Sequence, residues 1–255
     1  YNLKDITVTF PFQAFSVVAG VSGSGKSTLV TETLYPAVKQ DVYGRSLEAP
    51  GEFKGIKGTQ KLDRVLVVDQ SPVGKTSRSN PATYVGVFNH IRNLFAQTKE
   101  AKRRGFSKSH FSFNVDKGRC SNCQGKGYID VQMEFLADVQ VKCEDCNGDR
   151  YKSKVLEIDY KGKNIADVLS MTIEEAEDFF AKHPKINSKF RLLREIGLGY
   201  LQVGQVSTTL SGGEAQRLKL ARELVKHKRK HTIYLLDEPT TGLHAHDLEK
   251  LLNLL

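Results

Sequence analysis

Residues 20–27 form a glycine-rich stretch with the spacing G-x-x-x-x-G-K-S, which is typical of a loop that binds phosphate groups. Glycine suits such a loop because a Cβ atom would obstruct the close approach of the backbone to a phosphate. Backbone N–H groups and the positive end of the following helix would then face the anion. We expect Lys26 to reach the β- and γ-phosphates and the Ser27 hydroxyl to bind Mg²⁺, with ATP or ADP as the cofactor. The other predicted phosphate contacts are Gly20, Ser22, Gly23, Ser24, Gly25 and Thr28.

The segments around this loop supply the strand–loop–helix order that the motif requires. Residues 15–19 are apolar and rich in β-branched side chains, which predicts a buried strand. Residues 27–35 contain neither glycine nor proline, so they predict a helix, which Pro36 would help to end. We also expect a half-exposed strand within residues 1–12 and a surface loop over residues 39–60. A chance glycine-rich turn is the alternative, and it would not account for this context.

Two acidic residues and a glutamine follow two further predicted core strands. The apolar residues 233–236 lead into Asp237 and Glu238, and the apolar residues 65–68 are followed by Gln70. We expect Asp237 to bind Mg²⁺, Glu238 to orient or deprotonate the attacking water, and Gln70 to sense the metal or the water. Phosphoryl transfer needs mainly positioning and charge stabilisation, so Glu238, Gln70 and the loop lysine would suffice as catalytic residues.

The four cysteines stand in two C-x-x-C pairs, Cys120 with Cys123 and Cys143 with Cys146, separated by 19 residues. This spacing predicts a zinc site. The alternation of apolar and polar residues on either side of a turn near residues 136–137 predicts a β-hairpin that brings the pairs together. Four thiolates leave no open position, so we interpret the zinc as structural rather than catalytic. Cysteines used for metal indicate a reducing compartment, and we expect a cytoplasmic protein.

Seven basic and two acidic side chains lie between residues 99 and 119, and Phe106, Phe111 and Phe113 stand among them. Cations suit phosphates and aromatic faces can stack on bases, so this segment is a candidate DNA contact. The alternative is a solvated turn whose aromatic rings lie in the core, and the sequence does not separate the two. The candidate DNA-binding residues are Lys102, Arg103, Arg104, Lys108, Lys117 and Arg119.

Several segments outside these sites predict helices. The apolar residues between 84 and 95 recur at helical spacing on one face. Thr172 and Glu175 predict a capping box that opens a helix reaching Lys182, and residues 187–196 predict the next helix. A further helix is expected to begin at a serine and two glycines, whose N–H groups would face an anion. These three residues are Ser211, Gly212 and Gly213.

Composition limits the classes of protein that the chain could belong to. Hydrophobic residues make up 39% of the 255 residues, which is enough for a core, and no apolar run approaches the roughly 20 residues of a membrane helix. The net charge of +9 favours a polyanionic partner such as nucleic acid, although an ordinary basic surface would also account for it. No signal peptide is visible, and because the chain starts at Tyr1 we expect its natural N-terminus to lie upstream.

The string Leu210–Glu214, with Gln216, resembles the signature of the ABC-type ATPases, Gln70 resembles their Q-loop, and residues 241–244 resemble their D-loop. In that family two nucleotide-binding units pair head to tail, and the signature of one unit completes the nucleotide site of the other. The resemblance therefore implies that Ser211 serves a nucleotide other than the one beside Lys26. It also implies that this chain alone binds nucleotide but hydrolyses it poorly.

More specifically, the chain resembles the C-terminal half of the UvrA family, the damage-recognising ATPases of the bacterial excinuclease. The resemblance rests on the phosphate loop, the strings 69–74, 78–84 and 197–201, and the cysteine hairpin inserted ahead of the signature. It implies an ATPase of nucleotide excision repair that binds damaged double-stranded DNA. It further implies a second nucleotide-binding unit and the excinuclease subunit UvrB as partners, no membrane partner, and a zinc hairpin that couples damage sensing to ATP turnover.

Two alternatives stay open. His110, Asp116 and Asp149 stand where the family pattern is more basic, which would weaken DNA binding and leaves room for a UvrA-like paralogue linked to drug or antibiotic resistance. An ATPase subunit of an ABC transporter is the second alternative, and the inserted zinc hairpin argues against it.

The predicted fold class is α/β: a P-loop ABC-type ATPase domain interrupted by a helical signature subdomain and a zinc-anchored β-hairpin. We expect the ATP-binding core to comprise residues 1–82 and 207–255, and the inserted helical subdomain to comprise residues 83–206. The zinc hairpin would occupy about residues 118–150. The switch histidine of the family is expected beyond Leu255.

Overall fold

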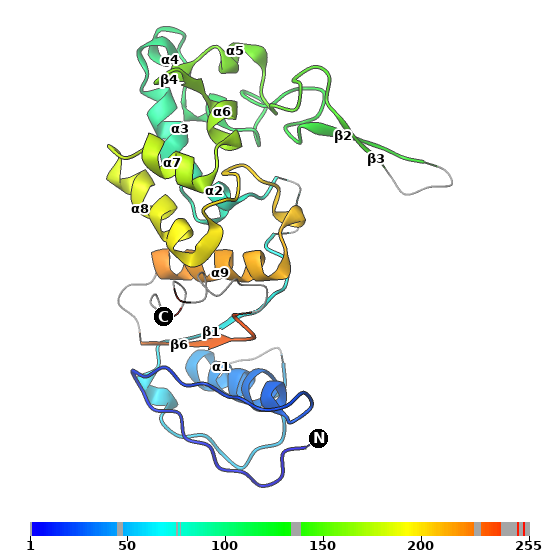
Figure 1. The fold of residues 1–255 in the computed structure, drawn as a ribbon, viewed down its shortest axis with the longest axis vertical. Coiled ribbons are helices and arrows are strands. Elements are labelled where there is room, and N and C mark those ends of the chain that lie inside the picture. Colours follow the sequence, from blue (N-terminus) through cyan, green and yellow to red (C-terminus); the bar gives the residue numbers. More distant parts are fainter. Residues whose placement is uncertain are drawn as a thin grey trace. The chain divides into compact units, whose positions relative to one another are not determined.

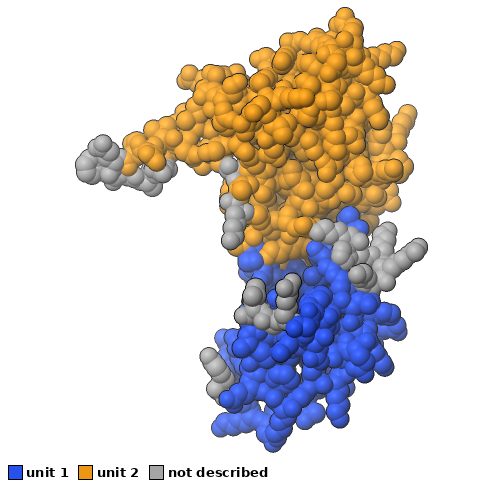
Figure 2. Space-filling view, turned by 180° about the vertical axis from the view of Figure 1, so that it is seen from behind, with its two compact units in different colours: residues 1–71, 223–255 blue, residues 72–222 orange. Residues whose placement is uncertain are grey.

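The computed structural model describes residues 2–44, 48–74, 76, 78–133, 139–226, 231–240, 249 and 252. The chain divides into two compact units, residues 1–71 with 223–255 (unit 1) and residues 72–222 (unit 2), coloured separately in Figure 2. The predicted boundaries after residues 82 and 206 remain a prediction. The α/β class is confirmed, because helices accompany three small sheets (Figure 1).

A two-stranded parallel sheet forms the centre of unit 1. Strand β1 (Arg64–Val68) pairs with β6 (Thr232–Leu236), and both confirm strands predicted from apolar runs. Helix α1 (Tyr35–Tyr43) packs on this sheet through Val38, which contacts Val65 and Leu235. Because the strands are parallel, the residues that follow both of them lie at the same edge of the sheet, where the Asp237 N–H donates to the Val68 carbonyl at 3.3 Å.

The helix after the phosphate loop is longer than predicted. Helical residues run from Lys26 through the π-helical stretch η1 (Thr28–Leu34) into α1, and Gly44, with a φ of 69°, ends them. The prediction that Pro36 ends the helix is therefore wrong. Pro36 lies where the π-helical stretch passes into α1, and the residues on both sides of it are helical. Of the loop predicted over residues 39–60, residues 39–43 are therefore helical instead, and the 3₁₀ turn η2 (Thr59–Lys61) lies at its end.

The two strands predicted ahead of the phosphate loop are not formed. Residues 2–19 contain no strand, and the side chains of Phe15 and Val17 are 60% and 73% exposed. Apolar and β-branched side chains favour a strand only where a neighbouring strand and a covering layer are present. Within the described residues β1 pairs with β6 alone, so these runs have no strand beside them.

Unit 2 is mainly helical, with a core of fully buried side chains that includes Ile91, Phe95, Phe180 and Phe190. The rings of Phe180 and Phe190 are stacked with centroids 6.1 Å apart. Its helices are α2 (Pro81–Tyr84), α3 (Phe88–Ala96), α4 (Lys99–Arg103), η3 (Lys108–Phe111), α5 (Ser153–Leu156), α6 (Ile165–Ser170), α7 (Ile173–Phe179), α8 (Pro184–Leu193), η4 (Arg194–Leu198), η5 (Ser207–Thr209) and α9 (Gly212–Lys226), which runs on into unit 1. The apolar face predicted between residues 84 and 95 is confirmed, although Gly86, at a φ of 73°, separates α2 from α3.

The capping box that opens α7 is formed as predicted. Thr172 Oγ1 accepts from the Glu175 N–H at 3.1 Å, and Glu175 Oε2 accepts from the Thr172 N–H at 2.8 Å. However, α7 ends at Phe179 rather than near Lys182, because α8 begins already at Pro184 and needs the residues between them as a connection.

A hairpin extends away from the helices of unit 2 (Figure 1). Strands β2 (Tyr128–Val131) and β3 (Val139–Lys142) are antiparallel, with Ile129 opposite Val141, which confirms the predicted hairpin. Its predicted turn at residues 136–137 lies outside the described residues. A third sheet consists of β4 (Asp159–Tyr160) and β5 (Lys163–Asn164).

Candidate nucleotide-binding and metal-binding sites

The phosphate loop of unit 1 adopts a backbone that requires glycine. Gly23 and Gly25 have φ values of 77° and 95°, in the left-handed region. A Cβ atom on Gly25 would lie 2.8 Å from the side chain of Leu3, so the loop also packs closely on the preceding segment. The Ser24 N–H donates to the Val21 carbonyl at 3.2 Å, and the helix begins directly afterwards, at Lys26.

Lys26 lies over this loop. Its ammonium group donates to the carbonyl oxygens of Gly20 at 2.8 Å and Val21 at 2.9 Å. The side chains and backbone around it line a hollow of about 320 Å³. The lining residues are Asn2, Ser22, Gly23, Gly25, Lys26, Ser27, Thr28 and Glu238. The structure thus brings most of the predicted phosphate contacts together with one of the two predicted acids.

The acidic residues occupy the edge of the sheet where β6 ends. Glu238 has a φ of 45°, which is a costly conformation for a residue other than glycine. This turn of the chain directs Glu238 to the hollow, although it comes more than 200 positions after the loop. Asp237 precedes it, and Gln70 follows β1 at the same edge, but neither lines the hollow.

Ser211 begins α9 in the way that the sequence predicts. Its hydroxyl accepts from the Glu214 N–H at 3.3 Å, and Glu214 Oε2 accepts from the Ser211 N–H at 2.7 Å. The other oxygen of Glu214 accepts from the hydroxyl of Tyr200 at 2.6 Å. Desolvation and this hydrogen bond together raise the pKa of Tyr200 to about 12, although its side chain is 59% exposed. Ser211 belongs to unit 2, whereas Lys26 belongs to unit 1.

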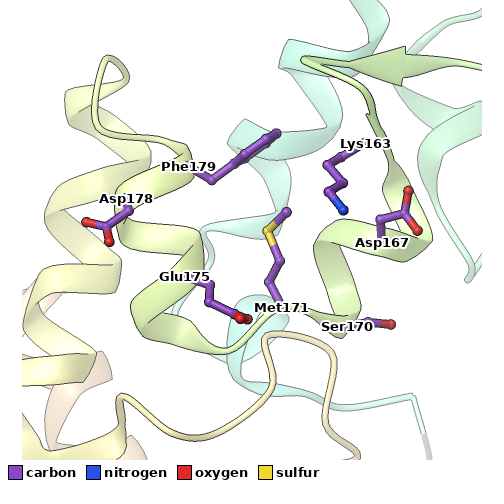
Figure 3. Close-up of a pocket in the computed structure, with 7 residues that line it drawn as sticks. All are labelled: Lys163, Asp167, Ser170, Met171, Glu175, Asp178 and Phe179. Atoms are coloured by element: carbon purple, nitrogen blue, oxygen red, sulfur yellow. The ribbon is translucent and has the colours of Figure 1, made fainter.

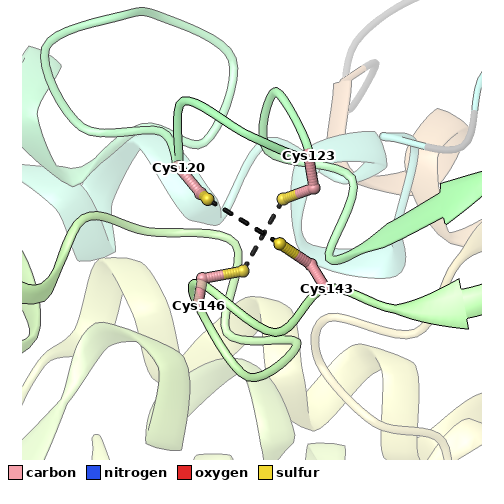
Figure 4. A group of neighbouring side chains, drawn as sticks. All are labelled: Cys120, Cys123, Cys143 and Cys146. Atoms are coloured by element: carbon pink, nitrogen blue, oxygen red, sulfur yellow. Dashed lines mark hydrogen bonds between the residues drawn. The ribbon is translucent and has the colours of Figure 1, made fainter.

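All four cysteines are buried and converge in unit 2 (Figure 4). Their sulfur atoms lie within 4.8 Å of one another, with 4.0 Å between Cys120 and Cys143 and 3.6 Å between Cys123 and Cys146. Sulfur atoms bound tetrahedrally to one zinc ion are about 3.8 Å apart, given a Zn–S distance of about 2.3 Å. The donor set therefore fits a closed tetrahedral zinc site.

The surroundings of the sulfur atoms also fit a cation. Burial raises the pKa of the Cys120 and Cys146 thiols, so their ionisation calls for a nearby positive charge. The N–H of Gly127 donates to Cys123 Sγ at 3.3 Å, and the φ of 86° at Gly127 permits that turn.

The basic segment separates into paired cations and buried rings. Arg103 donates to Glu100, and Arg104 bonds both Glu100 and Glu157. These two guanidinium groups lower the pKa of Glu100 to about 2. Arg119 forms an ion pair with Asp116, while Lys102 and Lys117 are exposed and Lys108 is half-buried.

The aromatic rings of this segment face the protein rather than the solvent. Phe111 and Phe113 are fully buried, and they contact the rings of Phe95 and Phe88 at centroid distances of 5.6 and 5.2 Å. Phe106 is stacked on His110 at 4.7 Å. For Phe111 and Phe113 the structure therefore supports the alternative in which the rings lie in the core, since buried faces are not open to bases.

A larger hollow of about 590 Å³ lies between α6 and α7 (Figure 3). None of the predicted site residues lines it. Two of its acids are engaged locally, because Asp167 accepts from the Asn164 N–H and Glu175 accepts from the Thr172 N–H. Contacts at helix starts thus engage two of the acids that line this hollow.

Comparison with known families accounts for this combination of motifs. The model of the family described as "ABC transporter" matches residues 3–241. The chain belongs to this ABC family. The match begins ahead of the phosphate loop and continues past the two acids, so it includes the inserted helices and the cysteine hairpin of unit 2.

Within the ABC family, the chain is similar to the proteins named UvrABC system protein A and UvrA2. The chain is 57% identical over its whole length to UvrABC system protein A of Staphylococcus epidermidis and of Aquifex aeolicus, and it spans 27% of each of those proteins. The crystal structure of UvrA2 from Deinococcus radiodurans matches with a TM-score of 0.79 and 50% identity, over 91% of this chain and 28% of that one. The chain thus spans about a quarter of the length of the relatives it matches.

The predicted D-loop, residues 241–244, lies outside the described residues. Among the helices that the structure describes, none is long and apolar enough to cross a membrane. Sequence reasoning missed Asn2 in the hollow, because Asn2 belongs to no motif and only the folded chain brings it there. Tyr200 lies in the string 197–201, but its contact with Glu214 beside the signature was not predicted.

Proposed function

We propose that this chain is the nucleotide-binding part, with its zinc module, of a UvrA-type ATPase that recognises damaged DNA in nucleotide excision repair. The observation that carries the proposal is the four-cysteine cluster between the phosphate loop and the signature of an ABC-family chain. A Walker-type loop alone would fit any member of the family. The high identity to UvrABC system protein A over the whole chain supports the same conclusion.

The hollow at the phosphate loop is where ATP would bind. Lys26 bonds two loop carbonyls, and a phosphate could take the place of those weak partners, because an ammonium–phosphate hydrogen bond is stronger than one to a neutral oxygen. Ser27 and Asp237 are the oxygen ligands for Mg²⁺, which would neutralise charge on the phosphates. Glu238, which lines the hollow, would orient or deprotonate the water, and Gln70 would sense it.

The nucleotide site is proposed to be completed by a second unit of the same kind. Ser211, Gly212 and Gly213 lie at the start of α9, where Glu214 holds the Ser211 backbone. In a head-to-tail pair these residues would contact the γ-phosphate held by the other unit's loop. Hydrolysis would then depend on pairing, and a single chain would turn ATP over poorly.

The zinc site is proposed to be structural. Its four buried sulfur ligands leave no position for substrate. It anchors the hairpin β2–β3, which as a two-stranded element has little stability of its own in water. UvrB is the proposed protein partner through other parts of the full-length protein, and a cytoplasmic location is proposed from the reduced cysteines.

Double-stranded DNA is the proposed polyanionic partner, and lysines are its best candidate contacts. Lys102, Lys108 and Lys117 are not engaged in the ion pairs that hold Arg103, Arg104 and Arg119. Because the three arginines are held in ion pairs, this segment would make fewer phosphate contacts and release fewer counterions than if all six cations were available. A UvrA-like paralogue with weaker DNA binding is therefore the second candidate function, and the similarity to a UvrA2 structure favours keeping it.

The test is a salt titration of DNA binding by the full-length protein, with lesion-containing and intact duplexes and with ATP present. The proposal predicts tighter binding to the lesion and a linear fall of log affinity with log salt concentration. Equal affinity for both duplexes would contradict damage recognition. Single-turnover ATP hydrolysis by the same preparation then shows whether the ATPase assignment holds independently of DNA.

A further inference from the structure

Arg150 joins the cysteine module to the segment that leads to the signature. It follows Cys146 by four positions and adopts a φ of 71°. Its backbone carbonyl accepts from the Cys120 N–H at 2.9 Å, so it links the two cysteine pairs. Its guanidinium group reaches out of the module, lies 5.6 Å from the ring centroid of Phe113, and donates to the Gly204 carbonyl at 3.1 Å.

The segment around Gly204, whose carbonyl accepts the hydrogen bond from Arg150, is fixed by further backbone hydrogen bonds. The N–H of Gly204 donates to the Leu169 carbonyl at 2.7 Å, and a Cβ atom on Gly204 would lie 2.8 Å from the Leu169 side chain. Three residues further on, the Ser207 N–H donates to the Ser79 carbonyl at 2.8 Å. Ser211 follows four residues later, so the contact of Arg150 lies seven positions ahead of the signature serine.

A second arginine makes the corresponding connection to the first cysteine pair. Arg78 donates to the carbonyl of Gln124 at 2.9 Å, directly after Cys123. Arg78 precedes Ser79, the residue that pairs with Ser207, and follows Gln70 by eight positions. The two cysteine pairs are therefore each bonded by an arginine to one of two adjoining segments, which lead to the Q-loop glutamine and to the signature.

We propose that Arg150 and Arg78 are positioning residues, through which the cysteine module fixes the position of the segment that leads to the signature serine. Both bonds run from a charged guanidinium to a backbone carbonyl, which makes them stronger than neutral hydrogen bonds and insensitive to pH in the physiological range. If loss of the metal or binding of a partner to the hairpin displaced the cysteine module, these bonds would move the segment that leads to Ser211. Only the expected effect on the nucleotide site rests on the proposed role of Ser211, and the positioning by the two arginines can be tested without nucleotide.

The experiment is amide hydrogen exchange of residues 203–211 in the zinc-loaded chain without nucleotide, comparing R150M and R78M with the wild type. Arg191→Met is the matched control, because Arg191 bonds only Asn187 of its own helix and Glu177. R150M should raise exchange in this segment about tenfold or more, the factor expected for one charge-assisted hydrogen bond, while zinc remains bound at one ion per chain. Chelation of zinc from the wild type should raise exchange at the same amides, and chelation from R150M should add little.

Two results would overturn the proposal. If the amide exchange rates of residues 203–211 in zinc-loaded R150M and R78M equalled those of the wild type, the arginines would not position this segment. Loss of zinc from R150M would make Arg150 a structural part of the metal site instead, and if R150M does not fold, R78M alone decides. ATP binding by the wild type, measured separately, tests the proposed function, so the two hypotheses can fail independently.

Discussion

The cysteine site and the phosphate loop are built in two different ways. The four sulfur ligands come from residues 120–146, are buried, and meet within 4.8 Å of one another. The hollow at the phosphate loop is lined by residues 2, 22, 23, 25–28 and 238, and its half-buried lysine donates to carbonyls of its own loop. The metal ligands are thus all supplied by one stretch of this chain, whereas the nucleotide site is the one that we propose to be completed by a second unit.

The largest expected effect is on the locally complete site. In C143S the metal would lose one of four thiolates, so zinc content should fall from one per chain to near zero. Unfolding stability should drop by about 3 kcal/mol or more, because metal binding and folding of such a module are coupled. Inductively coupled plasma mass spectrometry and urea unfolding measure the two quantities. Full zinc content in C143S would mean that the cluster is not the metal site.

The second effect is on the chemistry at the phosphate loop. E238Q keeps the size of the side chain but removes the proton acceptor, so hydrolysis in the paired, full-length protein should fall about 10²-fold or more, with ATP affinity nearly unchanged. Single-turnover hydrolysis and equilibrium nucleotide binding separate the two. An equal loss of affinity and rate would show that Glu238 binds nucleotide rather than acting on water.

A smaller effect is expected for the lysine of the loop. K26M removes one charge-assisted hydrogen bond to phosphate, so ATP affinity should fall about 10- to 100-fold. Its thermal unfolding should match that of the wild type, since the bonds that Lys26 makes are exposed. Titration with a fluorescent ATP analogue and thermal denaturation test this pair of expectations. A large loss of stability in K26M would contradict the expectation that the hydrogen bonds of Lys26 contribute little to folding.

The smallest effect concerns the basic segment and compares an exposed cation with a paired one. K117M should reduce the slope of log affinity against log salt for DNA by about one. R103M should change it less, because Arg103 is committed to Glu100, whose pKa it helps to lower to about 2. Filter binding between low and physiological salt measures both slopes. Equal slopes for both variants would remove the distinction between these cations.

The same difference in construction explains what the sequence could predict. The cysteine spacing and the alternation of the hairpin are local signals, and the structure confirms that the four residues converge. The strands β1 and β6 were predictable as buried apolar runs. Residues 15–19 carry the same signal but stay exposed, because strand formation depends on a neighbour that the local sequence does not specify.

Contacts between distant segments were beyond sequence reasoning for the same reason. Asn2 at the phosphate loop and the bond from Arg150 to Gly204 depend on where the folded chain brings those residues. Pro36 shows a different limit, since proline disfavours the interior of a helix, yet here a π-helical stretch precedes it and the helix continues into α1.

Native mass spectrometry of the chain with zinc, Mg²⁺ and ATP tests the central claim most directly, because it reads both sites in each assembly state. The account predicts one zinc ion per chain in monomers and pairs alike, and ATP retained preferentially by pairs. ATP retained equally well by single chains, or zinc found only in pairs, would contradict it.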